Sequence, residues 1–80
     1  MPRVVLYTRK GCHLCEDALA ALLQSGLTPQ SIDIDGDPAL RERFNDCVPV
    51  VEIDGRERFR GRVNPVLLRR IVAHNSDNFD

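Results

Sequence analysis

Apolar positions in the first half of the chain follow two different periods. Four consecutive apolar residues at positions 4–7 are typical of a strand that is buried on both faces. From about Cys12 to Ser25 apolar residues recur every three or four positions, which predicts a helix that Gly26 ends. Alternation of polar and apolar residues over 31–35 predicts a second, half-exposed strand. The residues expected on the buried side of the helix are Leu14, Ala18, Ala21, Leu22 and Ser25.

The second half of the chain is predicted to contain a hairpin between two helices. Asp37-Pro38 and Asn64-Pro65 each combine a capping residue with a proline, as helix starts do. The first of these helices is expected to reach residue 44 or 45, and the second to cover 66 to about 73. Asp54-Gly55 predicts a tight turn between two strands. These strands are expected over 48–53 and 57–60.

The predicted order of elements is βαβαββα, which defines an α/β fold. Its first half is a βαβ unit, whose two strands should be parallel and joined by a right-handed crossover. A four-stranded mixed sheet flanked by three helices buries both halves in one core. We therefore expect a single domain over residues 1–80, with an ordered core over about 3–73 and a frayed polar tail over 74–80.

Composition narrows the classes of function. The net charge of -1 argues against a nucleic-acid-binding domain, which would be strongly basic. No apolar run reaches the roughly 20 residues that span a membrane, and the N-terminus lacks the pattern of a signal peptide. Three cysteines in 80 residues do not fit a secreted disulfide scaffold, which carries an even number. We expect a soluble, cytoplasmic monomer whose thiols serve chemistry, with neither nucleic acid nor membrane as partner.

Cys12 and Cys15 stand where the first strand gives way to the first helix. Free N–H groups and the positive end of the helix dipole stabilise a thiolate there, which lowers its pKa. Cys12 should be exposed and act as the nucleophile, and Cys15, one turn further, should resolve the mixed disulfide. The residues positioned to stabilise the thiolate are Arg9, Lys10 and His13.

The cysteine pair has two other interpretations. Two small residues at helical spacing can simply pack inside a core, although the strand–turn–helix context favours a redox motif. A structural zinc site needs four ligands. Beyond the pair the chain offers only the scattered Cys47, His13 and His74, so the sequence does not favour zinc.

Two segments of the sequence resemble those of a known redox family. Residues 6–15, LYTRKGCHLC, resemble the active-site segment of glutaredoxins, and residues 47–51, CVPVV, resemble their Thr-Val-Pro loop. The predicted order of elements matches the glutaredoxin form of the thioredoxin-like fold over about residues 3–73. The resemblance implies a thiol–disulfide oxidoreductase that reduces disulfides or glutathione mixed disulfides. Glutathione is the expected co-substrate, and no tightly bound cofactor is expected.

The same resemblance implies a substrate site beside the cysteine pair. A cis peptide bond is expected between Val48 and Pro49, which would leave backbone groups of Val48 able to pair with an extended peptide or with glutathione. Without the resemblance, Pro49 could simply begin a strand. The residues implied to bind substrate or glutathione are Lys10, Val48, Pro49, Gly61, Arg62 and Asn64.

The end of the predicted fourth strand departs from the family pattern. Glutaredoxins carry a Gly-Gly pair there, followed shortly by an aspartate. Here Arg60 replaces the first glycine, Gly61 matches the second, and no aspartate follows. The N-terminus of the last helix, which Asn64 should cap, could still hold a carboxylate. A single glycine also resembles redoxins that thioredoxin reductase reduces, so the expected partners are a disulfide-containing protein or glutathione and, as a further possibility, thioredoxin reductase.

Two features of the sequence have more than one interpretation. Cys47 stands where the family has threonine; it could be a buried apolar residue, which we favour, a second resolving thiol or a ligand. The segment 56–62 contains four arginines and one acid, which favours an edge strand protected by charge over a docking surface for an acidic partner. The alternative functions are an iron–sulfur or metal-binding protein and a non-catalytic redox-sensing adaptor.

Overall fold

The computed structural model describes residues 3–44 and 48–77, so the prediction for Cys47 lies outside the described residues. The order of elements agrees with the sequence prediction, with one added 3₁₀ turn. The elements are β1 (Val4–Thr8), α1 (His13–Gln24), β2 (Gln30–Asp33), η1 (Ile34–Gly36), α2 (Pro38–Phe44), β3 (Val50–Ile53), β4 (Arg56–Arg60) and α3 (Pro65–Asp77).

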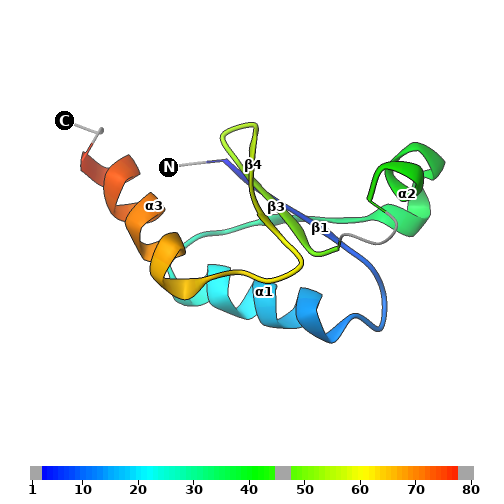
Figure 1. Ribbon diagram of the computed structural model, residues 1–80, viewed down its shortest axis with the longest axis horizontal. Helices are drawn as coiled ribbons and strands as arrows, with labels where there is room; N and C mark the ends of the chain where they lie inside the picture. The colour runs from blue at the N-terminus through cyan, green and yellow to red at the C-terminus, as the bar shows by residue number, and fades with distance from the viewer. Residues whose placement is uncertain (1–2, 45–47, 78–80) are drawn as a thin grey trace.

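The strands form one four-stranded mixed sheet with the order β2-β1-β3-β4. β1 and β2 are parallel, as the βαβ unit requires, while β3 runs antiparallel to both β1 and β4. Helices α1 and α3 lie along one side of the sheet, and α2 lies at the other (Figure 1). The predicted fold of a four-stranded mixed sheet with three helices is therefore confirmed.

The larger apolar core lies between the sheet and the helices α1 and α3. Every second residue of a strand points to the same face, and these residues of β1, β3 and β4 meet Ala18 and Leu22 of α1 and Leu68 of α3. Leu6, Leu22 and Val51 are at most 1% exposed. The strand residues of this core are Val4, Leu6, Val51, Ile53 and Phe59.

A smaller cluster lies on the opposite face, under α2. Ile34, Phe44 and Val50 are fully buried there, and Tyr7, Leu40 and Val48 pack against them. The rings of Tyr7 and Phe44 are 4.7 Å apart between centroids. This cluster therefore joins the end of β1, helix α2 and the residues before β3.

Several predicted boundaries were wrong by a few residues. The second strand ends at Asp33 because its carboxylate accepts the N–H of Asp35 at 2.9 Å, which starts the 3₁₀ turn η1. The last helix, predicted to end near residue 73, continues to Asp77. Leu14, expected on the buried side of α1, is 40% exposed, and Cys15 is buried beside Ala18 instead.

Among the described residues, we found no helix with both the length and the apolar character that a membrane span requires.

Candidate redox site

Three loops meet at one end of the sheet. Tyr7 of β1 pairs with Val50 of β3, and Val50 pairs with Arg60 of β4. The loop after β1, the residues before β3 and the loop after β4 therefore leave the sheet at the same end. These loops carry the predicted site residues, so the topology brings the Cys12 loop, Val48-Pro49 and Gly61 to one edge.

Cys12 is the N-cap of α1. Its backbone is extended, with φ -95° and ψ 106°, and its Sγ accepts the N–H of Cys15 at 3.1 Å. Gly11 precedes it with a φ of +75°, a conformation that glycine adopts without the cost that a side chain would add. The sulfur thus occupies the position in which an N-cap oxygen satisfies the first free N–H groups of a helix.

Cys12 and Cys15 form a disulfide, with their Cα atoms 5.2 Å apart. The two cysteines differ in exposure, because Cys15 is only 2% exposed whereas Cys12 is half-buried. Leu14, between them, is exposed. A reagent or a substrate that approaches from solvent can therefore reach the Cys12 sulfur more easily than that of Cys15.

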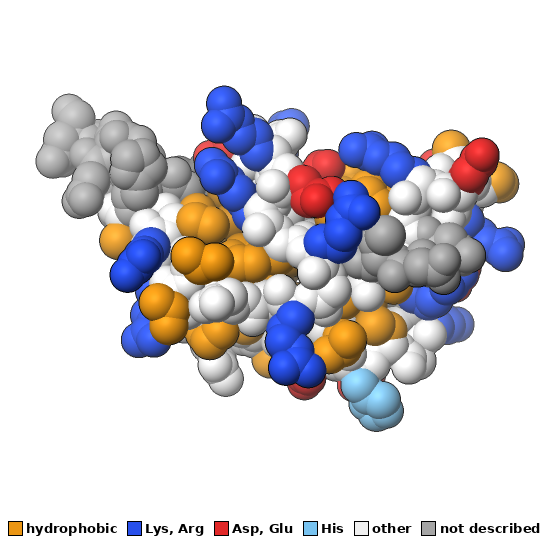
Figure 2. Space-filling view, in the orientation of Figure 1, with side chains coloured by type: hydrophobic (Ala, Val, Ile, Leu, Met, Phe, Trp, Pro, Cys, Tyr) orange, Lys and Arg blue, Asp and Glu red, His pale blue; other side chains and the backbone are white. Residues whose placement is uncertain are grey.

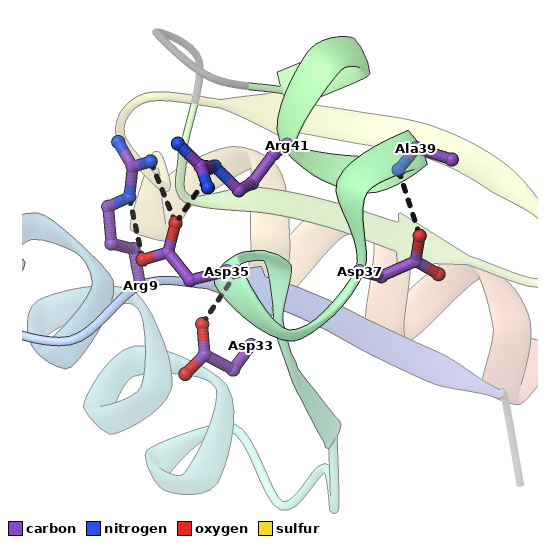
Figure 3. Close-up of polar contacts among 6 residues, drawn as sticks. All are labelled: Arg9, Asp33, Asp35, Asp37, Ala39 and Arg41. Carbon is purple, nitrogen blue, oxygen red and sulfur yellow. Dashed lines mark hydrogen bonds and ion pairs between the residues drawn. The ribbon is translucent and has the colours of Figure 1, made fainter.

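The guanidinium group of Arg9 is directed to Asp35 (Figure 3). Two N–H groups of Arg9 donate to the two carboxylate oxygens at 3.0 and 2.9 Å, and Arg41 of α2 lies 3.6 Å from the same carboxylate. The hydrogen bond from Arg9 lowers the pKa of Asp35 below its ordinary value. Arg9 therefore ties the loop before Cys12 to the η1–α2 segment.

The other two predicted thiolate-stabilising residues lie at the surface. The side chain of His13 is 96% exposed, with Nδ1 3.8 Å from a carboxylate oxygen of Glu16. Lys10 is exposed in the turn before the motif. Both belong to the loop or the first turn that carries Cys12.

The peptide bond between Val48 and Pro49 is cis, as the resemblance implied. Pro49 is buried and Val48 is half-buried. The carbonyl of Pro49 accepts the N–H of Gly61 at 2.7 Å, and Gly61 has a φ of +84°, which favours glycine. Gly61 thus links the loop after β4 to the residues before β3.

Asn64 caps α3. Its Oδ1 accepts the N–H groups of Val66 and Leu67 at 2.9 and 3.2 Å. These are the free N–H groups that a bound carboxylate would need. The predicted cap is confirmed, and it occupies the donors of the carboxylate site that the sequence suggested.

Arg62 lines a groove of about 340 Å³ that also contains Leu14 of the cysteine motif. The groove lies between α1 and the loop after β4, and Arg62 itself is exposed. Asp17, which the structure also describes, lines the same groove but forms no ion pair with Arg62. The lining residues are Leu14, Asp17, Ala18, Arg62 and Val63.

The sequence did not indicate the contacts of three polar residues near this end of the sheet: Tyr7, Asp17 and Asp35. Asp35 lies between Asp33 and Asp37, whose carboxylates accept N–H groups at the start of η1 and of α2 at 2.9 Å each (Figure 3). Tyr7 donates to Glu52 at 3.3 Å, and burial together with Glu52 raises the pKa of Tyr7. Nothing in the sequence indicated that Asp17 lines the groove, apart from its position half a helical turn after Cys15.

The part of the chain that the structure describes brings no three His, Cys, Asp or Glu side chains together in a metal-binding arrangement.

Comparison with known sequences matches the chain to the family model of the Glutaredoxin-like domain (DUF836), over residues 3–73. The "Uncharacterized protein Rv0508" of Mycobacterium tuberculosis is 38% identical over 84 residues, covering 94% of this chain and 87% of its own length. The "Uncharacterized protein Mb0520" of Mycobacterium bovis matches with the same identity and coverage.

Solved structures agree on the fold. The X-ray structure of target protein XcR50 from X. campestris has a TM-score of 0.76 at 34% identity, covering 89% of this chain and 96% of that one. Oxidised thioredoxin from Plasmodium falciparum has a TM-score of 0.61 at 13% identity, and the match covers 92% of this chain and 80% of that one. The thioredoxin-like protein BC3987 mutant T8A has a TM-score of 0.67 at 19% identity, and the match covers 90% of this chain and 99% of that one. With a thioredoxin-like fold and a cysteine pair at the start of α1, the chain belongs to the Glutaredoxin-like domain family.

Proposed function

We propose that the protein is a thiol–disulfide oxidoreductase that reduces disulfides of a protein or of glutathione through Cys12 and Cys15. The observation that carries the proposal is the asymmetric cysteine pair: Cys12 caps α1 and is partly exposed, whereas Cys15 is 2% exposed. Membership in the Glutaredoxin-like domain family and the thioredoxin-like fold support the same chemistry.

Cys12 is the nucleophile in this mechanism. In the dithiol form its sulfur keeps access to the N–H of Cys15, which donates to it at 3.1 Å in the disulfide form. A hydrogen bond and the helix dipole both favour the thiolate over the thiol, so a larger fraction of Cys12 is reactive near neutral pH.

The electrons and protons balance over two exchange steps. The Cys12 thiolate attacks one sulfur of the substrate disulfide, forms a mixed disulfide and expels the other sulfur as a thiolate that takes a proton from water. Cys15 loses its proton to water and attacks the Cys12 sulfur, releasing the second substrate thiol. The substrate disulfide is reduced to two thiols, and the Cys12–Cys15 dithiol is oxidised to the disulfide seen here.

Val48 and Pro49 shape the substrate groove in this proposal. Proline has no N–H, and the carbonyl of Pro49 is already bonded to Gly61, so backbone pairing with a substrate falls to Val48. An extended chain segment beside the disulfide would pair there as an added strand does.

The electron donor is either glutathione or a thioredoxin reductase. The N–H groups at the start of α3 are bonded to Asn64, and no aspartate follows Gly61 before that helix. This arrangement gives less support to glutathione than to a protein donor. Supplying the oxidised protein with glutathione and its reductase, or with thioredoxin reductase, and following NADPH consumption distinguishes the two.

Two substitutions test the reaction itself, each in a Cys47→Ser background so that only the pair remains. Cys12→Ser is expected to abolish reduction of 2-hydroxyethyl disulfide. Cys15→Ser is expected to react once and stay trapped as a mixed disulfide of the substrate mass, seen by mass spectrometry. Full turnover by the Cys12→Ser protein would refute the proposal.

A further inference from the structure

The charges of the chain are strongly segregated. Residues 56–73 contain six arginines and one acid, in a protein whose net charge is -1. The single acid, Glu57, is held by Arg60 at 2.8 Å. None of Arg56, Arg58, Arg62 and Arg70 forms an ion pair with a side chain of residues 3–44 or 48–73, the side chains that the structure describes. This part of the molecule therefore carries a positive charge that its own acids do not neutralise.

Protection of an edge strand accounts for only part of this charge. β4 is the edge of the sheet, and Arg58 is the extra residue at the register shift opposite Val51 and Glu52, as edge strands often show. Arg62, however, lies in the following loop and Arg70 lies on α3, where no strand edge needs protection.

One flank of α3 adds exposed apolar side chains to these arginines. The flank of α3 that faces α1 carries Pro65, Arg69 and Val72, which line a groove shared with that helix. By helical geometry, Leu67 lies on the opposite flank of α3. Val66 and Arg70 lie between the two flanks. Val66 is 50% exposed and Leu67 is 47% exposed. Figure 2 shows apolar side chains exposed among basic ones where α3 and β4 form the surface.

This surface reaches the redox site. Arg62 follows β4 and also lines the groove that contains Leu14, one of the two exposed residues between the cysteines. Arg62 therefore joins this surface to the first turn of α1, which Cys12 caps.

We propose that this surface, defined by Arg56, Arg58, Arg62, Val66, Leu67 and Arg70, docks an acidic protein that exchanges a disulfide with Cys12. The proposal rests on the proposed redox function and adds the chemistry of the partner. Arginine with an apolar centre is typical of protein interfaces, and the exposed Val66 and Leu67 supply such a centre, which a nucleic acid or a lipid headgroup would not need. The positive field speeds encounter with an acidic partner.

The test uses two synthetic peptides with the same intramolecular disulfide and one neighbouring leucine, one with a tail of glutamates and the other with a tail of lysines. The reduced Cys47→Ser protein is mixed with each, and the rate constant of reduction is measured at low salt. We expect the acidic peptide to react about tenfold faster. The difference should shrink to about twofold near 1 M salt, where the screening length is about 3 Å.

Neighbouring arginines provide the matched variants. Arg58→Glu and Arg70→Glu should each slow reduction of the acidic peptide by about threefold or more, whereas Arg69→Glu, which changes the charge equally but faces the α1–α3 groove, should have the smaller effect. Equal rates for the two peptides, or equal effects of Arg70→Glu and Arg69→Glu, would overturn the docking surface.

Uncharged 2-hydroxyethyl disulfide separates this inference from the function on which it rests. If the protein does not reduce it, the redox proposal fails. If all variants reduce it equally while the peptides are not distinguished, only the docking surface fails. Arginine-dependent binding to a DNA duplex or to phosphatidylserine vesicles, without a preference between the peptides, would assign the surface to a different partner and would also overturn the proposal.

Discussion

The two faces of the sheet are packed differently. The face under α1 and α3 holds a large core of aliphatic residues with Phe59, in which Leu6 and Leu22 are at most 1% exposed. The face under α2 holds three fully buried residues and is completed by Tyr7, whose hydroxyl donates to Glu52 at 3.3 Å. The large core therefore supplies most of the stability, while the smaller cluster fixes the loops of the redox site.

Residues of the smaller cluster are close in sequence to residues of the redox site. Tyr7 lies at the end of β1, five residues before Cys12, and Val48, which packs in the same cluster, precedes the cis peptide bond. A change in this cluster should move the site even where it costs little stability. Three pairs of substitutions test that division.

The largest effect is expected from Leu22→Ala in the large core. Truncation of a buried leucine leaves a cavity and costs about 2–5 kcal/mol, a large part of the roughly 4–12 kcal/mol expected for a domain of this length. Leu23→Ala is the matched control, because Leu23 is the next residue of α1 and is 54% exposed. Urea denaturation measures both. A loss below about 1 kcal/mol for Leu22→Ala would refute the assignment of stability to this core.

The same substitution in each cluster separates stability from positioning. Phe44→Leu and Phe59→Leu should each cost about 1–2 kcal/mol, since the two side chains are 1% and 6% exposed. Only Phe44→Leu should also slow the reduction of 2-hydroxyethyl disulfide, by several-fold at a temperature where both variants are folded. The reason is that Phe44→Leu removes the ring that lies 4.7 Å from the Tyr7 ring and that packs in the same cluster as Val48. Equal slowing by both variants would remove the distinction between the clusters.

The smallest effect concerns Asp35, which joins the Cys12 loop to α2. Its pKa is lowered by the hydrogen bond from Arg9, so its contribution to stability is present above the ordinary aspartate pKa of about 3.9 and is lost as the pH falls below that value. Asp35→Asn should therefore show a smaller decrease in denaturation midpoint between pH 5 and 3 than the unsubstituted protein. Glu42→Gln, at an exposed residue of α2, is the control. An unchanged pH dependence would show that the ion pair does not stabilise the fold.

The sequence was sufficient for the fold and for the cysteine pair. Strand runs, capping residues and Asp54-Gly55 act locally, and each was found in the predicted element. The Leu14 prediction failed because periodicity alone does not tell which of two adjacent apolar residues faces the sheet, and Cys15 is the buried one.

The hydrogen-bond partners of polar side chains could not be predicted from the sequence in the same way. Arg9 and Asp35 are 26 residues apart, and Tyr7 and Glu52 are 45 residues apart. Each pair forms only because the sheet brings β1 beside β2 and β3. The sequence therefore did not indicate the contact between Arg9 and Asp35.

The central claim is that Cys12 is the reactive thiol and Cys15 the protected one. The most direct measurement is the alkylation of the reduced Cys47→Ser protein by substoichiometric iodoacetamide from pH 5 to 9, with the labelled residue identified by peptide mass spectrometry. The account predicts that Cys12 is labelled first at every pH and reacts with a midpoint below the ordinary thiol pKa of about 8.5. Labelling of Cys15 at an equal or faster rate would contradict it.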